Sequence, residues 1–203
     1  MFTPLRYQAT PADCYPTSVL NALVWLFQRD ELPGAILQRI YAYCLDGIER
    51  GVVGSYTSEH ASLALMEWLG EFKTRSFAVT TEAVKGRDLH LRPSSGILRW
   101  LRHGGVAILD VRITTVTTHS ILALSAGADR VDFWDPCMRG TRYDYGRGAS
   151  RLDTDGRSPN LRVTKSWLDS ARIRRYSFGP LAERSGVLIR RTKRARRRSR
   201  AAA

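Results

Sequence analysis

Cysteine and histidine are scarce in this sequence, and neither occurs in a metal-binding pattern. The 203 residues include three cysteines, Cys14, Cys44 and Cys137, an odd number without a Cys-x-x-Cys pair. None of the four histidines lies at a spacing from a cysteine that is typical of a zinc site. We therefore expect no metal and no other cofactor, and a reducing, cytoplasmic setting.

Long hydrophobic runs are also absent. No uninterrupted apolar stretch approaches the roughly 20 residues that a membrane-spanning helix needs. The first residues, Met-Phe-Thr-Pro-Leu-Arg, lack the charged start and apolar run of a signal peptide. We expect no transmembrane segment and a single domain, because a chain of this length can bury a core without disulfides.

Acidic residues are missing from the C-terminal end, where positive charge is concentrated. Eight of the positive charges behind the net charge of +13 lie between Arg190 and Arg200, and subtracting them leaves +5. We therefore predict a mildly basic domain over residues 1–189 and a basic, disordered tail over residues 190–203. The tail is suited to contact nucleic acid, a membrane surface or another polyanion. A solvated extension without a specific target is the alternative.

Hydrophobic periodicity divides the chain into a helical half and a half dominated by strands. Apolar residues fall on nearly every side of a helix over residues 16–27, a pattern typical of a buried helix. We predict helices over residues 16–27, 33–45, 58–69, 97–102 and 164–173. We predict strands over residues 106–111, 120–124, 130–134 and 186–189, and a loop over residues 141–160. The predicted fold class is therefore α+β.

Cys14 lies at or just before the start of the first predicted helix. Pro16 suits the first turn because its missing amide hydrogen would have no intrahelical acceptor there, and Asp13 is a candidate N-cap. The positive end of a helix dipole lowers the pKa of a thiol, and the thiolate is the nucleophilic form. Cys14 is therefore our candidate nucleophile. A buried structural cysteine is the alternative, and it is our interpretation of Cys44.

His119 and Asp135 are candidate partners of Cys14. His119 begins one predicted strand and Asp135 follows the end of the next, with a hairpin turn at residues 126–129 between them. The start of one strand lies beside the end of the next in an antiparallel hairpin, so the two side chains should meet. Asp135 would then fix the imidazole tautomer and leave the other ring nitrogen for Cys14. The alternatives are a strand histidine bonded to a neighbour and an ordinary strand-ending turn at Asp135.

Gln8 is a candidate electrostatic stabiliser. It lies six residues before Cys14, so its side-chain amide could sit beside the Cys14 backbone amide. Two such donors form an oxyanion hole, which stabilises the negative charge that develops during acyl transfer. A surface glutamine without a role in catalysis is the alternative.

The order of these motifs resembles a known family. Gln-x5-Cys at a helix start, followed by His and by Asp-Pro on consecutive strands, is similar to the bacteriocin-processing (double-glycine) peptidase-like branch of the papain-like cysteine peptidases. The resemblance covers residues 5–136. It implies a papain-like fold in which an N-terminal helical lobe packs on a C-terminal antiparallel sheet, with substrate in the cleft between them.

The resemblance also implies a role for each candidate residue. Cys14 would be the nucleophile, His119 the general base, Asp135 its partner and Gln8 the oxyanion donor. The family pattern usually has a glycine directly after the cysteine, whereas this chain has Tyr15. A side chain at that position would narrow the cleft or change the group that it admits.

Three functions follow from these residues. The first is a cysteine peptidase or related amidase, a thiol hydrolase that cleaves a peptide or protein substrate through an acyl-thioester. The second is an acyltransferase, in which an amine rather than water resolves the same thioester. The third is a catalytically silent papain-like module that binds peptides or, through its basic tail, nucleic acid.

Overall fold

The computed structural model describes residues 3–49, 51–140 and 142–192. The helices of these ranges are α1 (Cys14–Leu26), α2 (Gly34–Tyr43), α3 (Glu59–Glu71), α4 (Gly96–Arg102) and α5 (Lys165–Leu168). The strands are β1 (Ile48–Glu49), β2 (Val52–Val53), β3 (Val79–Lys85), β4 (Val106–Arg112), β5 (Thr118–Ala126), β6 (Arg130–Trp134), β7 (Ala149–Arg151), β8 (Leu161–Thr164) and β9 (Ser185–Arg191). Short 3-10 turns occur at Arg29–Glu31, Gly86–Asp88 and Leu181–Glu183.

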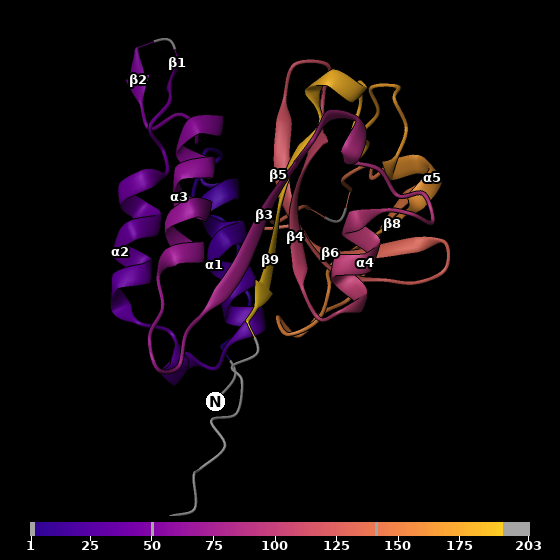
Figure 1. Cartoon of the computed structure of the whole chain (residues 1–203). Coiled ribbons are helices and arrows are strands. Elements are labelled where there is room, and N and C mark those ends of the chain that lie inside the picture. The colour runs from indigo at the N-terminus through magenta and orange to yellow at the C-terminus, as the bar shows by residue number, and fades with distance from the viewer. Residues whose placement is uncertain (1–2, 50, 141, 193–203) are drawn as a thin grey trace, which may run out of the picture.

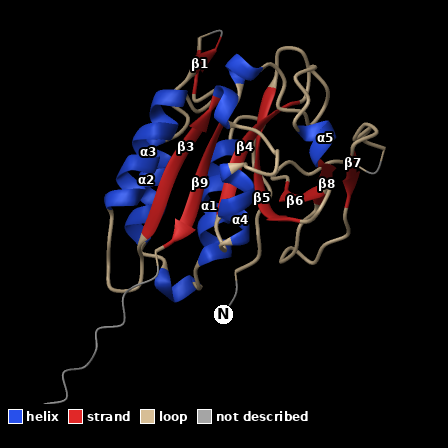
Figure 2. Cartoon of the chain, turned by 45° about the vertical axis from the view of Figure 1, so that its right-hand side comes forward, coloured by secondary structure: helices blue, strands red, loops and turns tan. Residues whose placement is uncertain are grey.

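A seven-stranded antiparallel sheet forms the centre of the molecule. Its strand order is β3-β9-β4-β5-β6-β8-β7, and a separate two-stranded hairpin pairs β1 with β2. The last strand, β9, pairs with β3 on one side and with β4 on the other, which places it inside the sheet. Figure 2 shows these three strands side by side. The predicted α+β class is confirmed.

Helices cover both faces of the sheet. Successive side chains of a strand point to opposite faces, and β4 follows this rule: Ile108 packs in the cluster that holds α1, α2 and α3, whereas Leu109 packs in the cluster that holds α4. In Figure 1 the first three helices lie on one side of the sheet and α4 lies on the other. Burial on both faces explains why this strand is a near-continuous apolar run.

Buried polar groups fix α1 and the preceding segment to the sheet. Ser18, on α1, donates its hydroxyl to the backbone oxygen of Ser120 on β5 at 3.1 Å. Asn21 bonds both backbone groups of Arg6, at 2.8 and 2.9 Å. The indole of Trp134, at the end of β6, also donates to the Arg6 oxygen at 2.9 Å. The start of α1 is therefore held beside the start of β5 and the end of β6.

The predicted helix over residues 164–173 is too long. The structure forms only α5, Lys165–Leu168, after which the chain turns away. Phe178 donates its backbone N–H to the Leu168 oxygen at 2.7 Å, so a returning segment takes a carbonyl that a longer helix would have used. A contact between residues ten positions apart ends this helix, and no stop signal in the local sequence marks it.

Several strands were not predicted from the sequence. The two-residue strands β1 and β2 are too short for a periodic pattern, and β7 lies inside the predicted loop over residues 141–160. β3 pairs with β9, and β8 pairs with β6, in antiparallel ladders. Pairing between segments this far apart in the chain adds to their weak local preference.

The C-terminal end of the sheet includes the first residues of the predicted tail. β9 continues through Arg191, whose guanidinium forms an ion pair with Glu31, and Arg190 stacks over the Trp100 ring at 4.7 Å. Residues 193–203 of the tail lie outside the described residues. In the part of the chain that the structure describes, no helix is long and apolar enough to cross a membrane.

Burial in α1 predicts a large stability cost for Leu23→Ala. The Leu23 side chain is fully buried in the core, and its truncation should lower the free energy of unfolding by about 2–5 kcal/mol. Leu37→Ala on α2, where the side chain is 44% exposed, is the matched control and should cost within about 0.5 kcal/mol. Urea unfolding measures both values, and equal losses would contradict the described packing.

Candidate active site

Cys14, His119 and Asp135 come together at one place in the structure. Cys14 is the first residue of α1, His119 the second residue of β5, and Asp135 the residue after β6. The Cys14 thiol is hydrogen-bonded to the His119 ring, and His119 Nε2 lies 2.6 Å from Asp135 Oδ1. Because Nε2 faces Asp135, Nδ1 is the ring nitrogen left for the thiol.

The hairpin β5–β6 produces the contact between His119 and Asp135. In its register Leu122 pairs with Trp134, so Asp135 is the first residue beyond the ladder. Its side chain reaches across to the start of β5, where His119 is 6% exposed and Asp135 only 2%. The predicted contact is present; the catalytic roles of both residues stay predictions.

The electrostatics of the site favour a charged thiol. Burial of Cys14 opposes ionisation, but the hydrogen bond and charge of His119 and the backbone amide of Ser120 outweigh it, so the pKa of Cys14 is lowered. Burial likewise opposes protonation of His119, yet its bonds to Asp135 and Cys14 raise its pKa to about 9. The lowered pKa of the thiol and the raised pKa of the imidazole both favour a thiolate paired with an imidazolium.

A network of neighbours fixes the Asp135 carboxylate and backbone. Tyr176 donates its hydroxyl to Oδ2 at 2.6 Å, and the backbone amide of Cys137 donates to Oδ1 at 2.8 Å. Arg139 lies 3.4 Å from Oδ2. The Asn160 side chain bonds the backbone N–H and C=O of Asp135 at 2.7 and 2.8 Å. Burial opposes ionisation of Asp135, but the hydrogen bond and charge of His119, the charge of Arg139 and the Tyr176 hydroxyl outweigh it and lower the pKa of Asp135.

Tyr176 and Asn160 were not found by sequence reasoning. They lie 41 and 25 residues from Asp135 in the chain, and no local pattern links them to it. Tyr176 is fully buried and has a φ of 61°, a left-handed conformation that costs energy for a residue other than glycine. The fold holds this residue in a strained conformation, with its hydroxyl on Asp135.

Gln8 lies in the loop before α1. Its backbone amide donates to the Pro136 oxygen at 2.8 Å, which ties this loop to the segment that carries Asp135. Its side-chain Nε2 donates to the Thr10 oxygen at 2.6 Å, and Gln8 is not among the described residues that line the cleft beside Cys14. The role of Gln8 as an oxyanion donor stays a prediction. It would use the second hydrogen of Nε2, because the first is bonded to the Thr10 oxygen.

Asp13 occupies the N-cap position of α1, but its side chain does not cap the helix. Its carboxylate instead accepts the backbone amides of Ala9 and Thr10 at 3.0 and 2.7 Å. These bonds fold the preceding loop back onto the helix start. The expected side-chain cap is therefore wrong, because the carboxylate bonds the amides of the preceding loop instead of those of the first helical turn.

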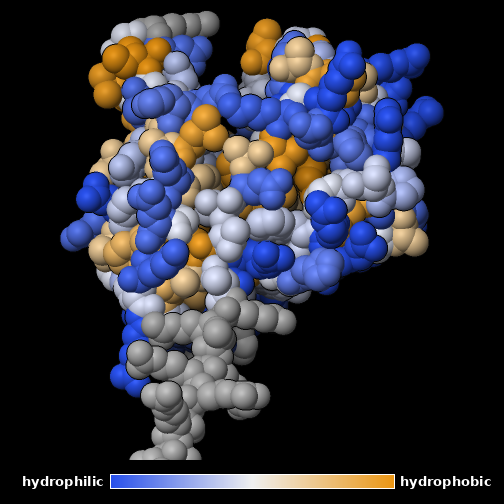
Figure 3. All heavy atoms as spheres, viewed as in Figure 1, coloured by the Kyte–Doolittle hydropathy of each residue, from blue (hydrophilic) through white to orange (hydrophobic). Residues whose placement is uncertain are grey.

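A cleft of about 830 Å³ opens beside Cys14. One wall is formed by the start of α3 and the β1–β2 hairpin, and the other by β4, β9 and the β4–β5 turn. In the space-filling view the molecule is hollowed between the hairpin and that turn (Figure 3). The thiol is thus accessible from a space large enough for a segment of peptide.

Tyr15, which stands where the family pattern has glycine, is part of the cleft wall. Its side chain is buried, and its hydroxyl donates to the Ser62 oxygen on α3 at 3.4 Å. Burial raises the pKa of this phenol. The ring packs between α1 and α3, and Cys14 still lines the cleft.

Asp110 is a further polar residue of the cleft that sequence reasoning missed. It lies on β4 opposite Ser120 and accepts the Ser120 hydroxyl at 2.6 Å and the Ser185 hydroxyl on its other oxygen. Its negative charge opposes ionisation of Cys14. The available signal was one carboxylate within the apolar run Val-Ala-Ile-Leu-Asp-Val.

The remaining cysteines differ from Cys14 in their environment. Cys44 is buried in the core beside α2, and burial raises its pKa to about 12. Burial also raises the pKa of Cys137. Within residues 3–49, 51–140 and 142–192, no group of three histidine, cysteine or acidic side chains is placed to hold a metal ion.

No protein-family model matches this chain, and no curated protein matches it.

The pKa differences predict selective modification of Cys14. Iodoacetamide should alkylate Cys14 faster than Cys44 and Cys137 at pH 6, because only the Cys14 pKa is lowered. His119→Ala should remove this advantage. Peptide mapping by mass spectrometry measures the three rates, and equal, slow labelling would contradict the described electrostatics.

Asp135→Asn should shift the pH dependence of this labelling to higher pH. Loss of the carboxylate lowers the pKa of His119, and the weaker imidazolium then raises that of Cys14. Each unit of that rise costs about tenfold in thiolate at pH values below the Cys14 pKa. The surface variant Asp88→Asn is the control and should keep the wild-type profile.

Proposed function

We propose that this chain is a cysteine peptidase-like thiol hydrolase that cleaves a peptide or amide bond. The observation that carries the proposal is the convergence of Cys14, His119 and Asp135 beside a cleft that Cys14 lines. The nucleophile is thus hydrogen-bonded to the base, and the base to the orienting carboxylate. This is the arrangement that acyl transfer through a thioester requires.

The first half of the proposed reaction forms the acyl-enzyme. The Cys14 thiolate attacks the carbonyl carbon of the scissile bond and forms a carbon–sulfur bond, while the π-electron pair of the carbonyl moves onto its oxygen. When the tetrahedral intermediate collapses, the carbon–nitrogen bond breaks and the His119 imidazolium gives its proton to the departing amine. Asp135 keeps the ring oriented and stabilises its charged form.

The second half returns the enzyme to its starting state. Neutral His119 takes a proton from a water molecule as that water attacks the thioester carbonyl. The carbon–sulfur bond then breaks, which releases the carboxylic acid and restores the thiolate and imidazolium pair. Donors for the two oxyanions are the Cys14 backbone amide, which has no intrahelical acceptor at a helix start, and the Gln8 side chain.

The proposal extends to a papain-like fold and to the double-glycine peptidase-like family. A helix that begins at the cysteine packs against an antiparallel sheet whose hairpin carries histidine and aspartate. This element order supports the proposal because the resemblance implies the same order. The natural partner would be a peptide or protein substrate, and the basic tail would remain available for a polyanion.

Acyl transfer from p-nitrophenyl acetate tests the reaction without knowledge of the substrate. We expect an acetyl group on Cys14, detected by mass spectrometry after acid quench, and its loss in water. The Cys14→Ser variant and His119→Ala should not form the thioester, whereas the control Cys44→Ser should form it. Acetylation spread equally over the cysteines would contradict the proposal, and release only by an added amine would identify an acyltransferase instead.

Peptide bond cleavage is tested with a mixture of unrelated peptides. New termini should appear with the wild-type chain and be absent with Cys14→Ser, which replaces the nucleophile with a similarly sized side chain. Mass spectrometry of the digest identifies both the cleavage and its sequence preference. A digest that is the same for both proteins would contradict peptidase activity.

A further inference from the structure

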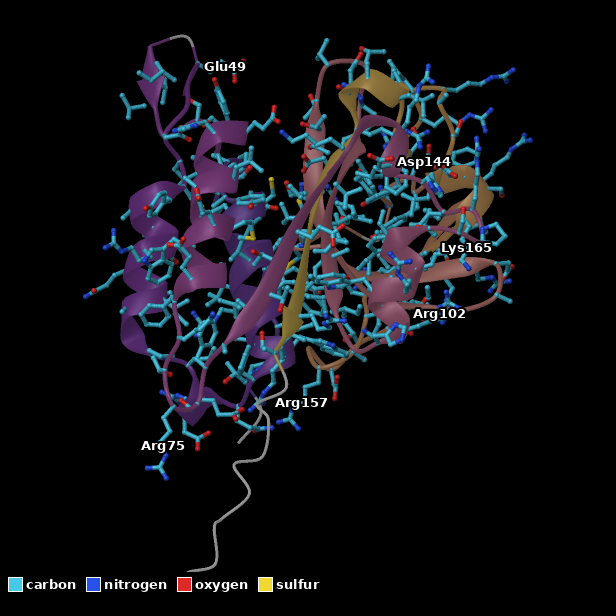
Figure 4. The ribbon with its side chains drawn as sticks, viewed as in Figure 1. Glu49, Arg75, Arg102, Asp144, Arg157 and Lys165 are labelled. Carbon is cyan, nitrogen blue, oxygen red and sulfur yellow. The ribbon has the colours of Figure 1, made fainter. Side chains whose placement is uncertain are left out.

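The described lining of the cleft beside Cys14 is negatively charged although the protein is strongly basic. The whole chain has a net charge of +13, yet among the described residues three carboxylates and one lysine line the cleft. In Figure 4 the labelled Glu49 lies at the β1–β2 hairpin. The labelled cations lie on other parts of the surface: Arg75, Arg102, Arg157 and Lys165. The charge of the cleft therefore opposes that of the rest of the molecule.

The lysine among the described lining residues does not neutralise the floor of the cleft. Lys85, on β3, forms an ion pair with Glu59 at the start of α3. That pair uses the lysine charge on the α3 side of the cleft. Among the described lining residues, the carboxylates outside this ion pair are Asp110 and Glu49.

Asp110 is held ready to accept further hydrogen bonds. Two serine hydroxyls, from Ser120 and Ser185, donate to its two oxygens and fix the plane of the carboxylate. A carboxylate offers about four acceptor positions, so two remain. Within the described ranges, no lysine, arginine or histidine forms an ion pair with Asp110. A half-buried carboxylate without a cation is suited to bind one from a ligand.

Apolar side chains on both rims favour a peptide over a small free amine. Val52, on the hairpin, is 63% exposed, and Val116, in the β4–β5 turn opposite, is 88% exposed. Tyr56 beside the hairpin is 47% exposed and also lines the cleft. Large exposed apolar groups at the mouth of a cleft indicate a binding surface for a ligand that extends beyond its floor.

We infer that the cleft selects a lysine or arginine side chain on the peptide whose carbonyl Cys14 attacks, and that Asp110 determines this specificity. The inference rests on the proposed function because it concerns the same cleft. The cation binds the free acceptor positions of Asp110, and flanking apolar residues of the peptide contact the two rims. The negative charge of Asp110 opposes thiolate formation at Cys14. Binding of a cationic side chain of the peptide gives this charge a function.

Paired peptide vinyl sulfones, which alkylate an activated thiol, test the inference on the full chain. One set has a lysine at each position before the electrophile in turn, and a matched set has norleucine, which has a similar length but no charge. The rate of Cys14 labelling is divided by the iodoacetamide rate of the same variant. At one position the lysine probe should be about tenfold or more faster than the norleucine probe.

Variants identify the residue responsible. Asp110→Asn keeps the size of the side chain and should bring the lysine-to-norleucine ratio close to one. Ser185→Ala, which removes one of the bonds that orient Asp110, should reduce the ratio by less. Glu67→Gln is the control, because Glu67 is exposed on α3 outside the cleft, and it should keep the wild-type ratio.

Each other outcome overturns the inference. Equal rates for lysine and norleucine at every position in the wild type would do so, as would a preference that survives Asp110→Asn. Asp110→Asn could instead slow only the release of the acyl group by added amines. Asp110 would then bind the amine that accepts the acyl group, and the inference would be wrong. Slow labelling of Cys14 by iodoacetamide in the wild type would instead contradict the proposed function, and this inference with it.

Discussion

The hydrogen bond between His119 and Asp135 is the interaction on which the rest of the site depends. It joins the start of β5 to the residue after β6, and it raises the pKa of His119 so that the imidazolium can stabilise the Cys14 thiolate. Burial of both residues opposes their charged forms, so the bond must be held in fixed geometry. The fold supplies that geometry through Tyr176 and Asn160, which bond the Asp135 side chain and backbone.

The segment that follows Asp135 also positions the loop before Cys14. The backbone amide of Gln8 donates to Pro136, directly after Asp135, and Asp13 folds the intervening loop onto the start of α1. The thiol and the histidine are therefore positioned by elements that share hydrogen bonds. Asp110 adds a negative charge near the thiol, and this like charge opposes thiolate formation. Asp110 lies in the same cleft as Cys14, so one carboxylate acts both on the pKa of the thiol and on the charge of a ligand bound there.

Local patterns in the sequence were sufficient for part of this arrangement. Helical periodicity and Pro16 indicated that Cys14 lies at or just before a helix start, and a hairpin between two apolar runs predicted the contact of His119 with Asp135. Tyr176 and Asn160 could not be predicted because their contacts with Asp135 depend on chain reversals far along the sequence. β3 likewise depends on its pairing with β9. The role of Asp13 was misjudged because loop and helix amides compete for one carboxylate.

Titration of the His119 ring by nuclear magnetic resonance tests the central claim most directly. The account predicts that the His119 ring protons shift with a midpoint near pH 9, and that the midpoint falls in Cys14→Ala and in Asp135→Asn. The imidazolium would then be the dominant form at neutral pH. A midpoint close to 6.5, the ordinary value, with no change in either variant would contradict a coupled Cys14–His119–Asp135 site.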